Sequence, residues 1–265
     1  MYCLTYKPHL TQLTYDIPKI LINFALKSNN MNDTSLSHNY YRIILCTFAI
    51  GFFFYFPLYS QINIKTGYSI SYLNPEVNNT ILADFNETNE DWLDNTFNDR
   101  HWFNGLHLGI RYKVDDIVGI ELGWVTQFGK TLAEGVEPVS EEGYYRKLNY
   151  SLNQFSFGLE PMATEFLGFG ASIDYNLFAI NSRDEPRSSK VKIVRDGNWS
   201  SHFFITYYTR SNNGIALGIR PFVRVPWTEV DYTGLPEDLE VSAPDGGNKD
   251  KNLHFGLSIL FFNGN

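Results

Sequence analysis

The chain has 265 residues, a formal net charge of −8 and a slightly polar mean hydropathy of −0.24, yet it carries 17 Tyr, 21 Phe and 5 Trp. This composition is unlike that of a helical membrane protein or a disordered chain, and it suits a β-protein with aromatic surface. The acidic balance argues against nucleic acid as a partner, because phosphate binding needs clustered Lys and Arg. Both cysteines, Cys3 and Cys46, lie near the N-terminus, which excludes a disulfide framework or thiolate metal site in the remainder.

An apolar run near the N-terminus predicts an export signal. Residues 43–56 follow Arg42 and form a run of 14 residues. This run is shorter than the roughly 20 residues of a transmembrane helix and matches the 7–15 of a signal-peptide hydrophobic region. Cleavage after the small Ser60 would leave Gln61 as the new N-terminus.

The position of this run divides the chain. Signal peptides begin a chain, and Met31 is a plausible initiator, so we interpret 1–30 as a non-native extension and 31–60 as the signal peptide. The alternative is an uncleaved anchor. Residues 61–265 are then one exported, acidic domain.

Eight segments of this domain alternate apolar with polar or small residues, the period of two that is typical of β-strands. In chain order they are 62–73, 105–113, 118–124, 146–160, 167–177, 199–210, 215–227 and 253–262. Long connections at 74–101, 129–145, 180–197 and 229–250 alternate with short ones. Pairing of the last strand with the first would close a barrel and leave no open edge.

The apolar alternation changes parity once, within the fourth strand. Leu148, Tyr150 and Leu152 are even-numbered, whereas the apolar residues from Phe155 onward are odd-numbered. One extra residue near 153–154 would restore the register, so the sequence predicts a β-bulge there.

The polar faces of the strands predict a narrow interior. Glycine recurs on them, as at Gly105, Gly109 and Gly119, and repeated glycine implies limited space, as inside an eight-stranded barrel. Charged side chains of both signs share these faces and are expected to pair in a polar network in the lumen: Lys65, Arg111, Glu121, Glu160, Asp174, Arg220 and Arg224.

The apolar faces are then expected to meet lipid. Aromatic side chains near strand ends are expected to form the interfacial girdles: Tyr72, Tyr112, Trp124, Tyr175, Trp199 and Trp227. An even strand number with alternating long and short connections is typical of outer-membrane barrels. The predicted fold is an all-β, eight-stranded, antiparallel up-and-down transmembrane β-barrel. The alternative is a soluble, secreted, lipocalin-like barrel with its apolar faces inside.

Four stretches resemble the PorT-like, OmpA-type outer-membrane β-barrel proteins of Bacteroidota. They are Leu58-Tyr59-Ser60 before Gln61, Ile64-Lys65-Thr66-Gly67-Tyr68-Ser69, Tyr145-Arg146-Lys147-Leu148-Asn149-Tyr150, and the aromatic-rich last strand. The resemblance covers about 61–265. It implies that the barrel-assembly machinery reads the C-terminal aromatics Phe255, Phe261 and Phe262, and it raises an envelope or secretion complex as a partner.

The predicted function is that of a non-enzymatic barrel with long acidic outer loops, in a structural or adhesive role and without cofactor or metal. Its expected partners are the bilayer and lipopolysaccharide, the latter through cations held by acidic loops. Residues 84–88 have the early spacing of a calcium loop but lack its turn glycine, so a solvated loop is favoured. A lipid-modifying or protease-like barrel is the enzymatic alternative, with candidate groups His101, His107, His202 and Ser200, but no spacing singles out a nucleophile and base.

Overall fold

The computed structural model describes residues 62–263, apart from 115–116, 139–140, 187 and 210–214. These residues belong to one compact unit, Leu58–Asn265. The predicted extension 1–30, the predicted signal peptide 31–60 and its cleavage site at Ser60 and Gln61 lie outside the described residues and stay predictions. Within the described ranges, no helix is both long and apolar enough to cross a membrane.

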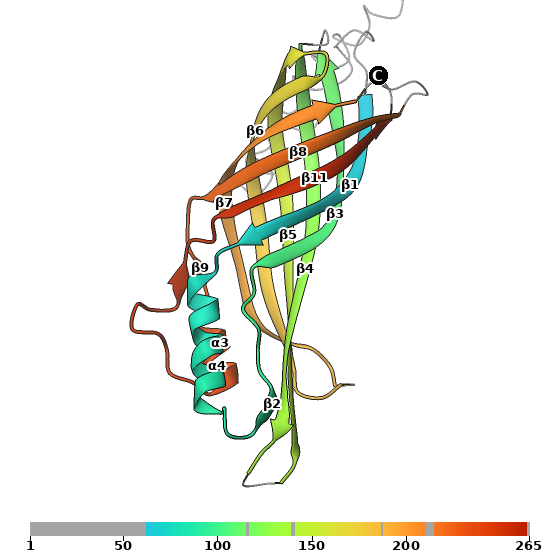
Figure 1. The fold of residues 1–265 in the computed structure, drawn as a ribbon. Coiled ribbons are helices and arrows are strands. Elements are labelled where there is room, and N and C mark those ends of the chain that lie inside the picture. Colours follow the sequence, from blue (N-terminus) through green and yellow to red (C-terminus); the bar gives the residue numbers. More distant parts are fainter. Residues whose placement is uncertain (1–61, 115–116, 139–140, 187, 210–214, 264–265) are drawn as a thin grey trace, which may run out of the picture. The chain divides into compact units, whose positions relative to one another are not determined.

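Eight long strands form a closed antiparallel ring (Figure 1). Each pairs with its neighbours in chain order, and the last pairs with the first, so the predicted eight-stranded up-and-down barrel is confirmed. The barrel strands are β1 (Ile62–Leu73), β3 (Trp102–Val114), β4 (Val118–Val136), β5 (Gly143–Thr164), β6 (Leu167–Arg183), β7 (Val191–Tyr208), β8 (Ile215–Pro226) and β11 (His254–Asn263).

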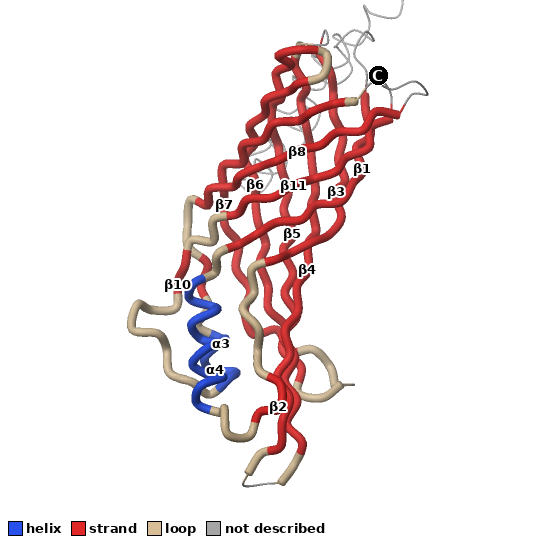
Figure 2. Tube along the Cα trace, in the orientation of Figure 1, coloured by secondary structure: helices blue, strands red, loops and turns tan. Residues whose placement is uncertain are grey.

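The wall of the barrel is much taller on one side. Strands β4 to β7 have 17–22 residues each, whereas β1, β3, β8 and β11 have 10–13. The longer strands continue past the shorter ones at the end away from the C-terminus (Figure 2). We call the part of β4 to β7 that extends past the shorter strands the tall wall. Two of the predicted loops, 129–145 and 180–197, are therefore wrong in large part, because most of their residues extend these four strands.

The predicted loop 74–101 is also not a simple loop. It contains the helix α3 (Glu76–Thr88) and the short strand β2 (Leu93–Asn95), which pairs with β4. The connection between β8 and β11 holds β9 (Val230–Asp231), the short helix α4 (Gly234–Leu239) and β10 (Lys249–Asp250). We call α3, β2, β9, α4 and β10 together the cap.

The predicted bulge near residues 153–154 is wrong. Asn153 and Gln154 keep an unbroken register with both neighbouring strands, and even-numbered residues of β5 point inward along its length. The apolar parity changes because the surroundings change. Leu152 is buried under the cap, whereas Phe155 is exposed on the outer wall. The irregularities of this sheet lie elsewhere, between Leu93 and Asn95, between Met162 and Thr164 and beside Ile180.

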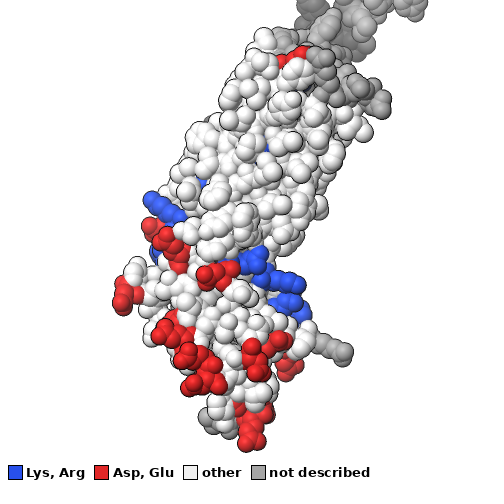
Figure 3. Space-filling view, in the orientation of Figure 1, with Lys and Arg blue, Asp and Glu red and all other residues white. Residues whose placement is uncertain are grey.

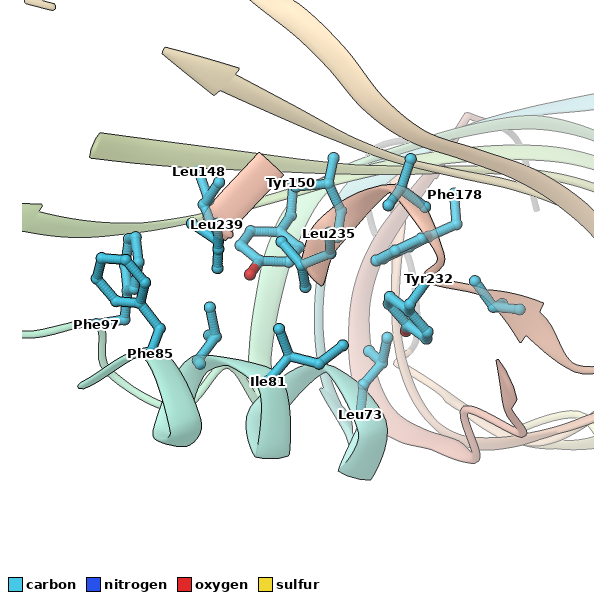
Figure 4. Packing of buried hydrophobic residues seen from close by; sticks show 14 of the residues in the cluster. Leu73, Ile81, Phe85, Phe97, Leu148, Tyr150, Phe178, Tyr232, Leu235 and Leu239 are labelled. Carbon is cyan, nitrogen blue, oxygen red and sulfur yellow. The ribbon is translucent and has the colours of Figure 1, made fainter. Parts of the chain in front are cut away.

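The hydrophobic core lies between the cap and the inner face of the tall wall (Figure 4). It is built from α3, α4 and the inward side chains of β4 to β7: Ile81, Leu82, Phe85, Ala133, Leu148, Tyr150, Leu152, Phe178, Ile180, Val194, Leu235 and Leu239. In the rest of the barrel the apolar side chains instead face outward and are exposed, for example Ile110, Leu122, Ile173 and Ile259. Figure 3 shows this part of the wall almost without charged side chains. An outward apolar band around a polar interior is the arrangement of a membrane-spanning barrel.

Candidate functional site

The charged side chains of the lumen lie where neighbouring strands offer glycine. A Cβ atom on Gly109 would lie 2.8 Å from Lys65 Cε, and one on Gly119 would lie 2.5 Å from Arg111 Nε. These glycines are needed for space, because any larger residue would displace a buried charged side chain.

Five of the predicted lumen residues form one ion cluster, which we call the inner cluster: Lys65, Arg111, Glu121, Glu160 and Arg220. Glu121 accepts a hydrogen bond from Lys65 Nζ at 2.8 Å and two from the Arg220 guanidinium at 2.7 and 2.8 Å. Arg111 and Arg220 both reach Glu160, at 3.1 and 3.4 Å. No side chain of the cluster is more than 6% exposed. Two carboxylates thus hold three cations from three different strands, and the paired geometry of Arg220 on Glu121 is the strongest form of such a contact.

The other two predicted lumen residues form a second cluster around Asp174. Its carboxylate accepts from Arg224 Nε at 2.7 Å and from the Ser172 hydroxyl at 2.6 Å, and His202 Nδ1 lies 3.2 Å away. The Asp174 side chain is fully buried. All seven charged residues predicted for the lumen are therefore buried in ion pairs, in two separate clusters.

Two lumen aromatics that the sequence did not single out support these cations. The Arg220 guanidinium lies 3.9 Å from the centre of the Phe204 ring, and that of Arg224 lies 4.6 Å from the centre of the Phe222 ring. Desolvated contacts of this kind add cation–π attraction to the ion pairs. The sequence does contain a signal for Phe222. It lies two residues from both Arg220 and Arg224, and strand alternation places all three on the same face.

A second pair of aromatics lies at the end of the lumen opposite the cap. The Tyr208 hydroxyl donates to Glu160 at 2.6 Å, and the Arg111 guanidinium lies over its ring at 4.8 Å. Phe262 packs edge-on against Tyr208 with ring centres 5.3 Å apart.

The predicted C-terminal assembly residues therefore do not share one face. Phe255 and Phe261 are half exposed on the outer wall, whereas Phe262 is 2% exposed and points into the lumen. Their recognition by the assembly machinery stays a prediction.

The candidate catalytic groups are not arranged as a nucleophile and base. His202 uses one ring nitrogen, Nδ1, toward both Asp174 and Ser172, whereas a catalytic triad places carboxylate and hydroxyl on opposite nitrogens. Ser200 accepts from the Asn176 amide at 3.0 Å and is buried. His101 lies at the rim, within 3.1 Å of the Leu73 carbonyl.

Several buried polar atoms of the lumen have no hydrogen-bond partner among the described protein atoms. They include both ring nitrogens of His107, both amide atoms of Gln154, Nε2 of His202 and Nη1 of Arg224. Buried groups of this kind are ordinarily satisfied by enclosed water. The middle of the lumen is therefore polar and suited to hold water.

The cap covers the mouth of the lumen at the end where β4 to β7 extend past the other strands. The inward face of α3 presents Asn78, Ile81, Leu82 and Phe85, spaced so that all four share one side of a helix. The Tyr150 hydroxyl donates to the Asn78 amide oxygen at 3.1 Å inside this core. The core and this internal hydrogen bond make the cap an ordered part of the fold.

An ion pair ties the cap to the tall wall. Arg146 of β5 lies 2.6 Å from Asp184 and 3.4 Å from Asp238 of α4. Burial raises the pKa of the Asp238 carboxyl above its usual value, against the opposing effects of Ser182 and Arg146. The α4 carboxylate is therefore partly desolvated by its contact with the wall.

The predicted outer aromatic girdle lies where the shorter strands end. Tyr175, Trp199 and Trp227 form a contiguous row, with ring centres 5.0 and 6.4 Å apart. Tyr72 packs against Trp102 on the other side of the barrel, at 5.3 Å. We call these five residues the outer aromatic row.

The two remaining girdle candidates lie elsewhere. Tyr112 pairs with Ile62 at the opposite end of the barrel. Trp124 pairs with Leu108 and Phe155 well inside β4, so its expected place near a strand end is wrong. The same holds for Tyr175 and Trp199, which lie in the middle of β6 and β7. The interfacial role of these aromatics stays a prediction.

The calcium-loop and solvated-loop interpretations of residues 84–88 are both wrong. These residues form the last turn of α3, and Phe85 within them is buried in the cap core. Among the residues that the structure describes, no group of three or more His, Cys, Asp or Glu side chains is placed to hold a metal ion.

No protein-family model matches this chain, and no curated protein sequence matches it. Among solved structures, the barrel is similar to Ail, the attachment invasion locus protein of Yersinia pestis, in complex with the heparin analogue sucrose octasulfate, with 8% identity, a TM-score of 0.40, and coverage of 77% of this chain and 97% of that one. It is also similar to the translocator domain of the autotransporter NalP from Neisseria meningitidis, with 10% identity, a TM-score of 0.38, and coverage of 87% and 97%. At these low values, neither likeness identifies a function for this chain.

Proposed function

We propose that the chain is a non-enzymatic, integral outer-membrane β-barrel that presents an ordered, acidic cap outside the cell. The observation that carries this proposal is the inversion of polarity across one wall, with exposed Ile and Leu outside and ion pairs inside. Even-numbered antiparallel barrels of this kind are typical of bacterial outer membranes. The predicted signal peptide supplies the route of export.

The lumen of this barrel is filled by side chains and does not conduct solutes. The inner cluster joins Lys65, Glu121 and Arg220 across it, and the cap core lies over its outer mouth. Eight-stranded barrels generally have interiors that side chains fill. Reconstituted protein should therefore show no stable conductance steps in a planar bilayer, and reproducible steps would contradict this part of the proposal.

The cap suits a structural or adhesive role, or a place in an envelope or secretion complex. Its carboxylates gather at the end of the molecule away from the C-terminus, over α3 and the tip of the tall wall (Figure 3). They include Glu76, Glu87, Glu90, Asp91, Glu237 and Glu240 in and beside the cap elements, and Glu137 and Glu141 lie with them at the tip of the wall. A rigid acidic lobe favours a basic protein surface or divalent cations as contacts. The bilayer, lipopolysaccharide and the barrel-assembly machinery complete the proposed partners.

The enzymatic alternative has little geometric support. The only Ser, His and Asp group that we find among the described lumen residues is Ser172, His202 and Asp174, and it uses a single ring nitrogen of the histidine. It is also buried between Phe204 and Phe222, without an exposed nucleophile.

Gel mobility of the membrane-extracted protein, boiled against unboiled, tests the proposed function. A folded barrel resists detergent and should migrate differently after heating, in the outer-membrane fraction. A protein found in the soluble periplasmic fraction without a heat shift would contradict the proposal and favour the soluble lipocalin-like barrel.

A further inference from the structure

The outer face of the tall wall carries a cluster of cations that the lumen and the cap do not use. It consists of Lys130 on β4, Lys147 on β5, Arg183 on β6, and Lys192 and Arg195 on β7. We call these five residues the basic wall. Lys130, Lys192 and Arg195 are exposed, and Lys147 and Arg183 are half-buried.

Strand register places these side chains on one continuous surface. Lys147 lies directly opposite Arg183, and the next row toward the membrane joins Lys130, Asn149, Asn181 and Lys192. One row closer still, Arg195 lies opposite Ala179, which pairs with Ser151. Residues at these positions share the outer face because side chains alternate along each strand. The register shift between Ile180 and Asn181 brings Lys192 onto the same face as Arg195, three residues along β7.

The basic wall is not balanced by acidic side chains of its own face. The outward residues between its members are uncharged: Leu132, Asn149, Ser151, Ala179 and Asn181. No ion pair joins any of the five cations to a described carboxylate, and Glu134 stands one row farther from the membrane. This cluster stands in a chain whose net charge is −8.

The direct opposition of Lys147 and Arg183 is unfavourable by itself. Like charges at directly paired positions of an antiparallel sheet repel each other and destabilise it. A bound anion between them would relieve this repulsion. The pairing therefore points to an anionic ligand in addition to the net charge of the surface.

The height of the basic wall identifies the kind of anion. Arg195 lies four residues outward of Trp199 along β7, about 13 Å at 3.3 Å per residue, and Lys130 lies two residues outward of the exposed Phe128 along β4. Aromatic side chains mark the interface of a barrel with the bilayer. The basic wall therefore begins with Lys130 at the edge of the apolar band, at the depth of lipid headgroups, and continues outward along the strands through Arg195 to Lys147 and Arg183.

We propose that the basic wall binds the phosphate groups of an anionic phosphoglycolipid in the surrounding outer leaflet, of the lipid A type. The lipid chains lie against the apolar band below, and the phosphates lie between the paired cations above. This inference rests on the proposed function, since only a membrane-inserted barrel holds the basic wall at headgroup depth. It differs from cation-bridged contact through acidic loops, because the contact here is direct.

The test uses the full folded protein in detergent micelles, titrated with bisphosphorylated lipid A. The double variant Lys147→Gln, Arg183→Gln removes the opposed pair. The matched control, Lys249→Gln, Lys251→Gln, removes two exposed cations in and beside the cap strand β10. The heat shift on gels verifies that every variant is folded.

The wild-type protein and the control should bind lipid A with an affinity that falls as salt rises, and the Lys147, Arg183 variant should bind about tenfold more weakly. Without lipid A, the same variant should melt at the same temperature as wild type or higher, because it lacks the repulsion between the two side chains. With lipid A, only wild type and the control should gain thermal stability.

Equal binding by all three proteins would overturn the inference, as would equal binding of dephosphorylated lipid A. Equal affinity for the deacylated, water-soluble headgroup would overturn the assignment to a membrane lipid. These results leave the heat shift unaffected, so they are distinguishable from a failure of the proposed function, in which the protein would show no heat shift at all.

Discussion

Strands β4 to β7 form both the apolar band and the tall wall beyond it, but their apolar side chains point outward in the band and inward in the tall wall. In β5, Gln154 and Glu160 point inward and Phe155 and Phe157 point outward within the band. Farther out along the same strand, Leu148 points inward into the cap core. The alternation of the strand does not change; its surroundings do.

This difference shows that the surroundings of each part of a strand determine which of its two faces is apolar. In the band, lipid surrounds the barrel and its interior must be polar to satisfy its charges. In the tall wall, the outer face carries polar and charged side chains, and the inner face is covered by α3 and α4. The point at which the apolar face changes sides therefore marks the membrane surface in the sequence.

The largest expected effect is loss of the carboxylate that joins the lumen cations. Glu121→Ala leaves Lys65 and Arg220 buried without their main partner, and breaking a buried ion pair costs about 3–5 kcal/mol. Equilibrium unfolding in lipid vesicles measures this loss. Glu134→Ala, which removes a carboxylate from the outer face of the tall wall, is the control and should change stability by less than about 0.5 kcal/mol. Equal effects at both sites would mean that the lumen is well hydrated.

A lysine on the outer face distinguishes the two regions directly. Ile173 and Asn181 both point outward on β6, the first within the band and the second beyond the outer aromatic row. Ile173→Lys should cost about 2–4 kcal/mol, because a charge near the centre of a bilayer is desolvated. Asn181→Lys should cost little, because water reaches that position. The same vesicle unfolding assay compares them, and similar costs would contradict the proposed membrane boundary.

A substitution in the cap core should act locally. Leu82 is fully buried between α3 and the tall wall, so Leu82→Ala should cost about 2 kcal/mol, at the lower end for core leucines because the rim can relax. Hydrogen exchange should show faster opening of α3 while the heat shift of the barrel is retained. Loss of the heat shift would instead mean that cap and barrel unfold as one cooperative unit.

The strand count, the closure of the ring and the polarity of its faces were predictable, because each strand of the band carries its own alternation. The bulge near residues 153–154 was wrong because a change of apolar face and a bulge leave the same trace in a sequence. Only the neighbouring elements, here α3 and α4, distinguish them.

The cap was missed although its signal was present. Asn78, Ile81, Leu82 and Phe85 have helical spacing, but the acidic Asp84 and Glu87 in the same stretch favoured a polar loop. The basic wall was beyond prediction, because it exists only through register: Lys147 and Arg183 are far apart in sequence and become neighbours when β5 pairs with β6.

The smallest expected effect is a pH dependence confined to the cap. Burial raises the pKa of Asp238 in the folded state, so the folded cap binds this proton more tightly than the unfolded chain, whose Asp titrates near about 3.9. The contribution of the group to stability is then full below that value and is lost as pH rises through the raised pKa. Asp238→Asn should therefore reduce the difference in cap opening between acid and neutral pH.

Hydrogen exchange of α4, corrected for intrinsic rates, measures this difference, with the exposed Asp245→Asn as the control for loss of one carboxylate. Because Asp238 also contacts Arg146 at 3.4 Å, the variant loses an ion pair, and that loss acts mainly at neutral pH. A cap that opens more readily in Asp238→Asn at pH 7 than in wild type would mean that the ion pair outweighs the cost of desolvation. The wall would then hold the cap by charge as well as by its hydrophobic core.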